Sequence, residues 1–202
     1  MIDEGYTKFR VDWTKSGPLL NPEIDELNAW RPPLFAAKLI GHYEDHGVGY
    51  GNTSMRVNAS RQFLISGTQT GHLESLGRAH YALVTDYHIS DNRVSCTGPI
   101  QASSESMTHA MIYELDPAIN AIIHVHDRRL WTRFKDRMPT TDAAVSYGTP
   151  EMALEFARLF DSTDFRESGI AVMAGHEEGL VSIGSDIESA ARRILSLRAN
   201  KT

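Results

Sequence analysis

Two kinds of apolar pattern alternate along the chain, and together they predict strands interleaved with helices. Runs rich in β-branched and aromatic residues that end at turn residues are typical of strands. They predict strands at 53–57, 62–66, 81–88, 93–96, 121–125, 170–173 and 180–183. The turn residues at 58–61 are expected to join the first two of these strands in a hairpin.

Helix start and stop signals, with apolar residues three to four positions apart, predict the helices. Asn21 followed by Pro22 is typical of a helix N-terminus, and the pair Pro32-Pro33 predicts the end of that helix. A second helix is expected from about residue 34 to 44. Three more are expected, from Ser103 or Ser104 to Asp116, from Thr149 to about Phe160, and from the capping box of Ser185 with Glu188.

Hairpins that alternate with helices predict an α/β fold, in which helices cover a sheet with antiparallel parts. No Pro/Gly/Ser-rich linker or repeat divides the 202 residues, of which 41% are hydrophobic. We therefore expect a single domain over residues 1–202. Residues 1–20 are loosely patterned and are expected to form an N-terminal arm.

Charge and composition argue against several classes of partner. The net charge is -6, with 20 Lys+Arg against 26 Asp+Glu, which does not favour nucleic-acid binding. No apolar run approaches the roughly 20 residues that span a bilayer, so no membrane association is expected. The single cysteine, Cys96, excludes an internal disulfide, and the first residues lack the pattern of a secretory signal. A cytoplasmic location is expected.

Two histidines in one predicted strand have the spacing of a metal-binding pair. His124 and His126 are separated by one residue, and positions i and i+2 of a strand point to the same face. Neutral imidazoles suit zinc or a similar divalent ion, and His176, after Gly175, can supply a third nitrogen. The alternative is a structural role, because histidine is often a hydrogen-bonded residue of a half-buried strand.

Glu105 follows Ser103 and Ser104 at the start of the helix that precedes the histidine strand. A helix that folds back on the next strand brings its first turn near the far end of that strand. The Glu105 carboxylate could there bind a resting metal ion, then leave it and act as general base when substrate arrives. The alternative is an ordinary acidic residue that the helix dipole favours.

Small and hydroxyl-bearing residues cluster in three stretches, 51–54, 66–71 and 103–104. Small residues let backbone amides approach a ligand, and a helix N-terminus with serine hydroxyls is suited to an anion. Together these stretches could hold a phosphate or carboxylate without arginine. The alternative is that they form ordinary turns, in which the same residues are common.

The order of these elements resembles the class II aldolase/adducin family, which includes fuculose-phosphate aldolase and ribulose-phosphate 4-epimerase. The resemblance covers roughly residues 34–197, and these motifs in this order are specific. The motifs are Gly51-Asn52-x-Ser54-x-Arg56, Ser66-Gly67-Thr68-x-Thr70-Gly71, Ser103-Ser104-Glu105, His124-x-His126 and Gly175-His176.

The resemblance implies a three-layer α/β/α sandwich with a central, largely antiparallel mixed sheet, and a cyclic homotetramer with active sites between subunits. It also implies a lyase that cleaves or forms a carbon-carbon bond in a small sugar or sugar phosphate through a metal-stabilised enediolate. The ion would be Zn²⁺ or another divalent metal. By this resemblance the ligands are His124, His126 and His176, the acid/base is Glu105, and the phosphate site comprises Asn52, Gly67, Gly71, Ser103 and Ser104.

The chain also departs from the family pattern. The family aldolases use a tyrosine after the histidine pair, but residues 127–146 contain none, and Tyr147 comes only next to Gly148. The glycine pattern of 66–71 is longer than the usual Thr-Pro-x-Gly. An epimerase or dehydratase on the same site therefore remains an alternative. A non-catalytic interaction domain like the adducin head is a third, although retention of the three histidines and Glu105 argues against it.

Overall fold

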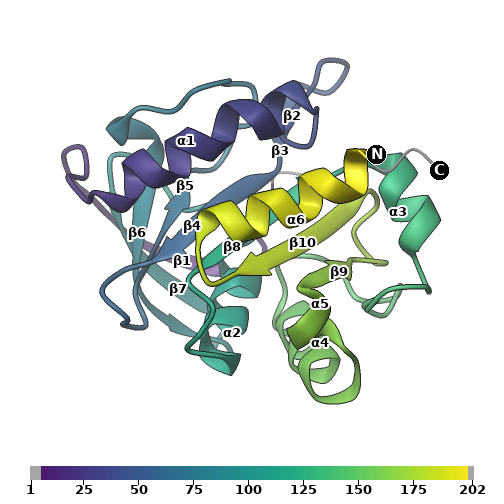
Figure 1. Ribbon diagram of the computed structural model, residues 1–202. Coiled ribbons are helices and arrows are strands. Elements are labelled where there is room, and N and C mark those ends of the chain that lie inside the picture. Colours follow the sequence, from purple (N-terminus) through teal and green to yellow (C-terminus); the bar gives the residue numbers. More distant parts are fainter. Residues whose placement is uncertain (1–5, 200–202) are drawn as a thin grey trace.

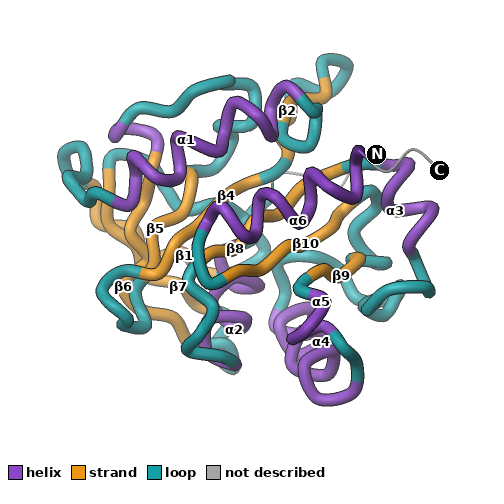
Figure 2. The backbone as a smooth tube through the Cα atoms, viewed as in Figure 1, coloured by secondary structure: helices purple, strands orange, loops and turns teal. Residues whose placement is uncertain are grey.

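The fold is built around one eight-stranded sheet (Figure 1). The computed structural model describes residues 6–199. The strands are β1 Arg10–Lys15, β4 Asn52–Arg56, β5 Phe63–Ser66, β6 Tyr81–His88, β7 Arg93–Gly98, β8 Ala121–His126, β9 Ile170–Val172 and β10 Gly179–Gly184. Their order across the sheet is β1-β7-β6-β5-β4-β8-β10-β9. β1 pairs parallel to β7 and every other pair of neighbours is antiparallel. Figure 2 shows these strands as one layer, with helices in front of it and behind it.

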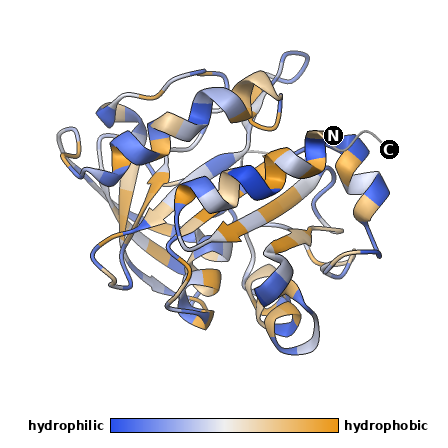
Figure 3. Ribbon diagram, viewed as in Figure 1, coloured by the Kyte–Doolittle hydropathy of each residue, from blue (hydrophilic) through white to orange (hydrophobic). Residues whose placement is uncertain are grey.

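Helices cover both faces of the sheet and bury a separate apolar core on each. α1 (Glu23–Ala36) and α6 (Ile187–Ala199) lie on one face, and α2 (Ser106–Leu115), α4 (Pro150–Ser162) and the short α5 (Phe165–Ser168) lie on the other. β10 is largely hydrophobic in Figure 3, whereas α6, which covers it, alternates between hydrophobic and hydrophilic residues. This arrangement confirms the predicted α/β fold with a largely antiparallel mixed sheet.

Two smaller elements lie outside the main sheet. β2 (Gly41–Tyr43) and β3 (Val48–Tyr50) pair in a two-stranded hairpin, and α3 (Arg128–Phe134) directly follows β8. A single turn of 3-10 helix at Arg78–His80 precedes β6. Within the described residues, 6–199, no helix has the length and hydropathy needed to cross a bilayer.

The N-terminal segment is more ordered than the arm predicted at 1–20. Residues 1–5 lie outside the described residues, but residues 10–15 form β1 and pair with β7 at the edge of the sheet. Trp13 fastens this strand by donating its indole N–H to the carbonyl of Gly98 at 3.0 Å. An edge strand buries little of its surface, so its apolar alternation is too weak to recognise in the sequence.

The prediction of a helix end at Pro32-Pro33 and a second helix at 34–44 is wrong. α1 continues through both prolines to Ala36, and a hairpin replaces the second helix. The buried face of α1 explains why it continues: Ile24, Leu27, Arg31 and Leu34 are all fully buried at helical spacing. The free energy gained by packing this face exceeds the cost of the two backbone hydrogen-bond donors that the prolines remove.

Two of the predicted helix starts also shift. α2 begins at Ser106, and its N-cap residue is Glu105. Neither of the two predicted serines, Ser103 or Ser104, is the cap. α6 is capped one residue later than predicted, because Asp186 accepts a hydrogen bond from the Ser189 amide at 2.6 Å. Thr149 caps α4 as predicted, through the amide of Met152 at 3.2 Å.

Candidate active site

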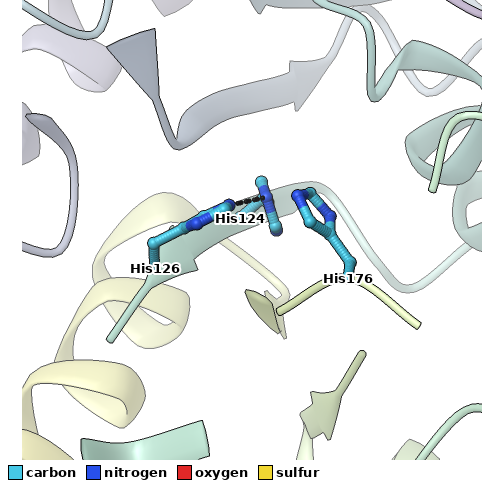
Figure 4. A group of neighbouring side chains, drawn as sticks. All are labelled: His124, His126 and His176. Carbon is cyan, nitrogen blue, oxygen red and sulfur yellow. Dashed lines mark hydrogen bonds between the residues drawn. The ribbon is translucent and has the colours of Figure 1, made fainter. Parts of the chain in front are cut away.

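The two histidines of β8 lie on one face of the sheet, as their spacing predicts. Ile122, His124 and His126 alternate with residues that face α1 and α6, and Ile122 belongs to the core beneath α2 and α4. His124 is 1% exposed and His126 is 3% exposed. Their Nε2 atoms approach to 3.0 Å (Figure 4), so the two rings point at a common position.

The third histidine reaches the same position from the loop between β9 and β10. β10 pairs with β8 so that Gly179 lies opposite His126, and the loop before β10 therefore ends beside the pair. His176 is 4% exposed, and one ligand atom from each of the three histidines lies within 4.8 Å of the others. The loop depends on Gly175, because any β-carbon there would collide with the carbonyl of Val145.

Burial keeps the two imidazoles of β8 neutral. It lowers the pKa of His124 and of His126 well below 6.5, and the neighbouring His176 lowers both further. His124 Nδ1 lies 3.2 Å from the carbonyl oxygen of Leu180, which can only accept, so Nδ1 carries the proton and Nε2 is left with its lone pair. A neutral histidine whose outer N–H bonds a carbonyl is the usual form of a metal ligand.

Glu105, the N-cap residue of α2, contacts the third histidine. Its side chain is 3% exposed, and its Oε1 lies 3.3 Å from His176 Nδ1. Burial raises the pKa of Glu105, but the adjacent His176 and His124 outweigh that effect and lower it, which favours the carboxylate. Neither carboxylate oxygen has a hydrogen-bond partner of good geometry among residues 6–199. A buried carboxylate without such partners suits a site that takes a cation.

A polar hollow adjoins the histidine cluster and shares Glu105 with it. All five residues predicted for the phosphate site line it. The lining residues are Gly49, Gly51, Asn52, Gly67, Thr68, Gln69, Thr70, Gly71, Ser103, Ser104 and Glu105. The Asn52 side-chain oxygen is buried there without a hydrogen-bond partner in the described part of the chain. The glycines keep backbones close, since a β-carbon at Gly71 would collide with the carbonyl of Gly41.

Two tyrosines lie beside the histidines, and the sequence assigns neither of them a role in the site. Tyr147 stacks on His176 with ring centroids 4.3 Å apart, and Gly148 beside it has a φ of +68°. Tyr43 lies 3.1 Å from His126 Nδ1. The only signal for Tyr147 was its position after the histidine strand, and Tyr43 was hidden in a segment predicted to be helical.

His109 lies in α2, four residues after Glu105. It is fully buried in α2, with Nδ1 2.7 Å from the hydroxyl of Ser54 in β4, which in turn lies 2.8 Å from the hydroxyl of Tyr113. Burial lowers the pKa of His109 to about 3. His109 therefore joins α2 to β4 as a neutral residue.

Comparison with known proteins places the chain in a family. A model of the family described as "Class II Aldolase and Adducin N-terminal domain" matches residues 36–199. The chain belongs to this family. The class II aldolase and adducin resemblance seen in the sequence is thereby confirmed. No curated protein matches the chain at a significant level.

Several solved structures share the fold of this family member. L-fuculose 1-phosphate aldolase is 17% identical, with a TM-score of 0.65 over 90% of this chain and 85% of that one. A sugar-phosphate aldolase from Thermotoga maritima is 17% identical, with a TM-score of 0.65 over 87% of this chain and 90% of that one. An aldolase II superfamily protein from Pseudomonas syringae is 15% identical, with a TM-score of 0.60 over 89% and 74% of the two chains. At these identities the likeness is one of fold.

Proposed function

We propose that this protein is a metal-dependent, aldolase-type lyase that cleaves or forms a carbon-carbon bond in a small sugar phosphate. The observation that carries the proposal is the convergence of three buried imidazoles beside the buried carboxylate of Glu105, whose Oε1 lies 3.3 Å from His176 Nδ1. Membership of the family supports it, as do the names of the structures that share the fold. Zn²⁺ or another divalent ion is the proposed cofactor.

The proposed ligands are His124, His126 and His176. All three are buried, and the pKa of each β8 histidine is lowered, so the rings offer lone pairs instead of protons at neutral pH. Three nitrogen ligands leave a fourth position for substrate, as in catalytic zinc sites. An ion held there would supply Lewis acidity to a carbonyl and a hydroxyl oxygen of the substrate.

Glu105 is proposed as the acid/base. Its carboxylate takes the proton of a substrate hydroxyl as the carbon-carbon bond breaks, and returns a proton to the remaining carbon fragment. The position of Glu105 supports this role, because it lies at the junction of the histidine cluster and the polar hollow. Substrate held across that junction would place its reacting carbons next to this one carboxylate.

The polar hollow is proposed to bind the phosphate through Asn52, Gly67, Gly71, Ser103 and Ser104. Backbone amides beside glycine and the hydroxyls of serine are neutral donors that can surround an anion, and the N-terminus of α2 adds its partial positive charge. No arginine or lysine lines the hollow within the described chain, so neutral donors would provide the recognition.

A product assay with candidate ketose phosphates tests the activity. An aldehyde together with a three-carbon fragment is the expected result, in the presence of zinc and not after chelation. An unchanged carbon skeleton would instead indicate the epimerase, and loss of water the dehydratase. If purified protein carried less than about one tenth of an ion per chain, the non-catalytic alternative would be favoured.

The same proposal includes a homotetramer. Four chains of 22.5 kDa would elute as one assembly of about four times that mass, which light scattering coupled to gel filtration measures directly. A monomer at micromolar concentration would contradict this part of the proposal while leaving the chemistry of the site unaffected.

A further inference from the structure

The β2–β3 hairpin brings a tyrosine hydroxyl to the outer nitrogen of one proposed ligand. Tyr43 Oη lies 3.1 Å from His126 Nδ1, and it donates a hydrogen bond to Glu178 Oε2 at 2.7 Å. We propose that Tyr43 is a positioning residue that fixes the tautomer and orientation of His126 for cation binding. The inference rests on the proposed function, and it adds a residue from outside the family motifs.

The single hydrogen of the Tyr43 hydroxyl explains why it selects one tautomer of His126. A phenol has a single hydrogen, and Tyr43 gives it to the Glu178 carboxylate. Toward His126 the same oxygen can only accept, so His126 Nδ1 must carry the ring proton and Nε2 must carry the lone pair. This is the tautomer that the Leu180 carbonyl imposes on His124.

The two Nε2 atoms then face each other with lone pairs and no proton between them. They are 3.0 Å apart, and two acceptors at that distance repel each other unless a cation lies close to both. Nitrogens bound tetrahedrally to zinc at about 2.0–2.1 Å are roughly 3.4 Å apart. The observed separation of the two Nε2 atoms is therefore close to that of two zinc ligands. In a core without a cation, nothing would favour this pair of tautomers.

Glu178 is itself held in place, so the direction of the Tyr43 hydroxyl is defined. Arg128 at the start of α3 donates to Glu178 Oε1 at 2.7 Å and also pairs with Glu177 Oε1 at 2.9 Å. The Glu178 backbone has a φ of +69°, and its carbonyl accepts the amide of Asp127 at 2.9 Å. Both carboxylate oxygens of Glu178 therefore have a donor, one from α3 and one from the hairpin.

Tyr50 provides a matched control on the same hairpin. Its ring lies 5.4 Å from the His126 ring and 4.6 Å from that of Tyr43, so it packs against the same histidine. Its hydroxyl, however, points to the carbonyl of Lys38 at 3.5 Å. Tyr50→Phe removes an equal hydroxyl from the same hairpin without touching a histidine nitrogen.

The test compares zinc affinity of the full chain and its variants by competition with a chromophoric chelator. Loss of a hydrogen bond to a metal-bound histidine typically lowers metal affinity about 10–100-fold. We expect that loss for Tyr43→Phe and wild-type affinity for Tyr50→Phe, with both variants showing the wild-type circular dichroism spectrum. Equal affinity of Tyr43→Phe and wild type, or equal loss in both variants, would overturn the inference.

A second measurement needs no variant and covers the case in which Tyr43→Phe does not fold. The ¹⁵N shifts of the His126 ring in metal-free wild-type protein report which nitrogen is protonated. The expected result is Nδ1–H, and an Nε2–H tautomer would overturn the inference. If wild-type protein binds no zinc, the proposed function itself fails; if it binds zinc but Tyr43→Phe matches wild type, only the role of Tyr43 fails.

Discussion

His109 should make the metal-free protein sensitive to acid. It is fully buried, its Nδ1 bonds Ser54, and its Nε2 has no hydrogen-bond partner in the described residues. No acceptor is therefore ready for the second N–H of a protonated ring. Burial accordingly lowers the pKa of His109 from 6.5 to about 3 in the folded protein. In the unfolded chain the pKa of His109 is not lowered, because the ring is not buried.

The sign and size of the effect follow from the linkage between protonation and folding. Below about pH 6.5 the unfolded chain binds a proton at His109 that the folded protein does not bind until about pH 3. Stability is thus lost as the pH falls through that window, and none of this loss occurs above it. Between about pH 7.5 and pH 5 the contribution of His109 to the free energy of unfolding should fall by about 2 kcal/mol.

Urea unfolding of chelator-treated protein at several pH values, followed by circular dichroism, measures this loss. His109→Asn keeps a polar atom near Ser54 but cannot titrate, so its stability should fall about 2 kcal/mol less than that of wild type over the same pH range. His46→Asn, at an exposed position, controls for the change of residue type. If the loss of stability between about pH 7.5 and pH 5 differed by less than about 0.5 kcal/mol between wild type and His109→Asn, His109 would not be the source of the acid sensitivity.

Three further substitutions test other parts of the account. Glu105→Gln should lower kcat about 10²–10⁴-fold in a steady-state assay while the zinc content stays that of wild type, and kcat within about threefold of wild type would exclude Glu105 as the acid/base. Gly71→Ala should weaken the binding of inorganic phosphate measured by calorimetry, because the new methyl group meets the carbonyl of Gly41. Unchanged phosphate binding would show that the polar hollow is not the anion site. Asp186→Ala should cost about 1 kcal/mol in urea unfolding through loss of the cap on Ser189, with zinc affinity unchanged as the internal check.

The parts of the fold that the sequence predicts well are those with strong local signals. β8 is rich in β-branched residues and follows the stop at Asp116-Pro117, and α4 begins at a Thr-Pro pair. β1 and the continuation of α1 through Pro32-Pro33 depend instead on contacts with distant residues. β1 is an edge strand set by pairing with β7, and α1 continues because its buried face packs on the sheet.

The candidate site divides in the same way. The spacing of His124 and His126 predicts a pair on one face of a strand, and the order of the family motifs relates this pair to His176 and Glu105. Tyr43 carries no such signal. Its place beside His126 depends on a contact with Glu178, 135 positions away, which only the folded chain brings about.

The coordination of zinc is the sharpest test of the three-histidine site. The K-edge X-ray absorption spectrum of protein loaded with zinc and then dialysed reports the number and type of ligands. We expect about one ion per chain, with three imidazole nitrogens at about 2.0–2.1 Å and a fourth light atom. Fewer than three imidazoles, or an unchanged spectrum in His124→Ala, would contradict the assignment of His124, His126 and His176 as a metal site.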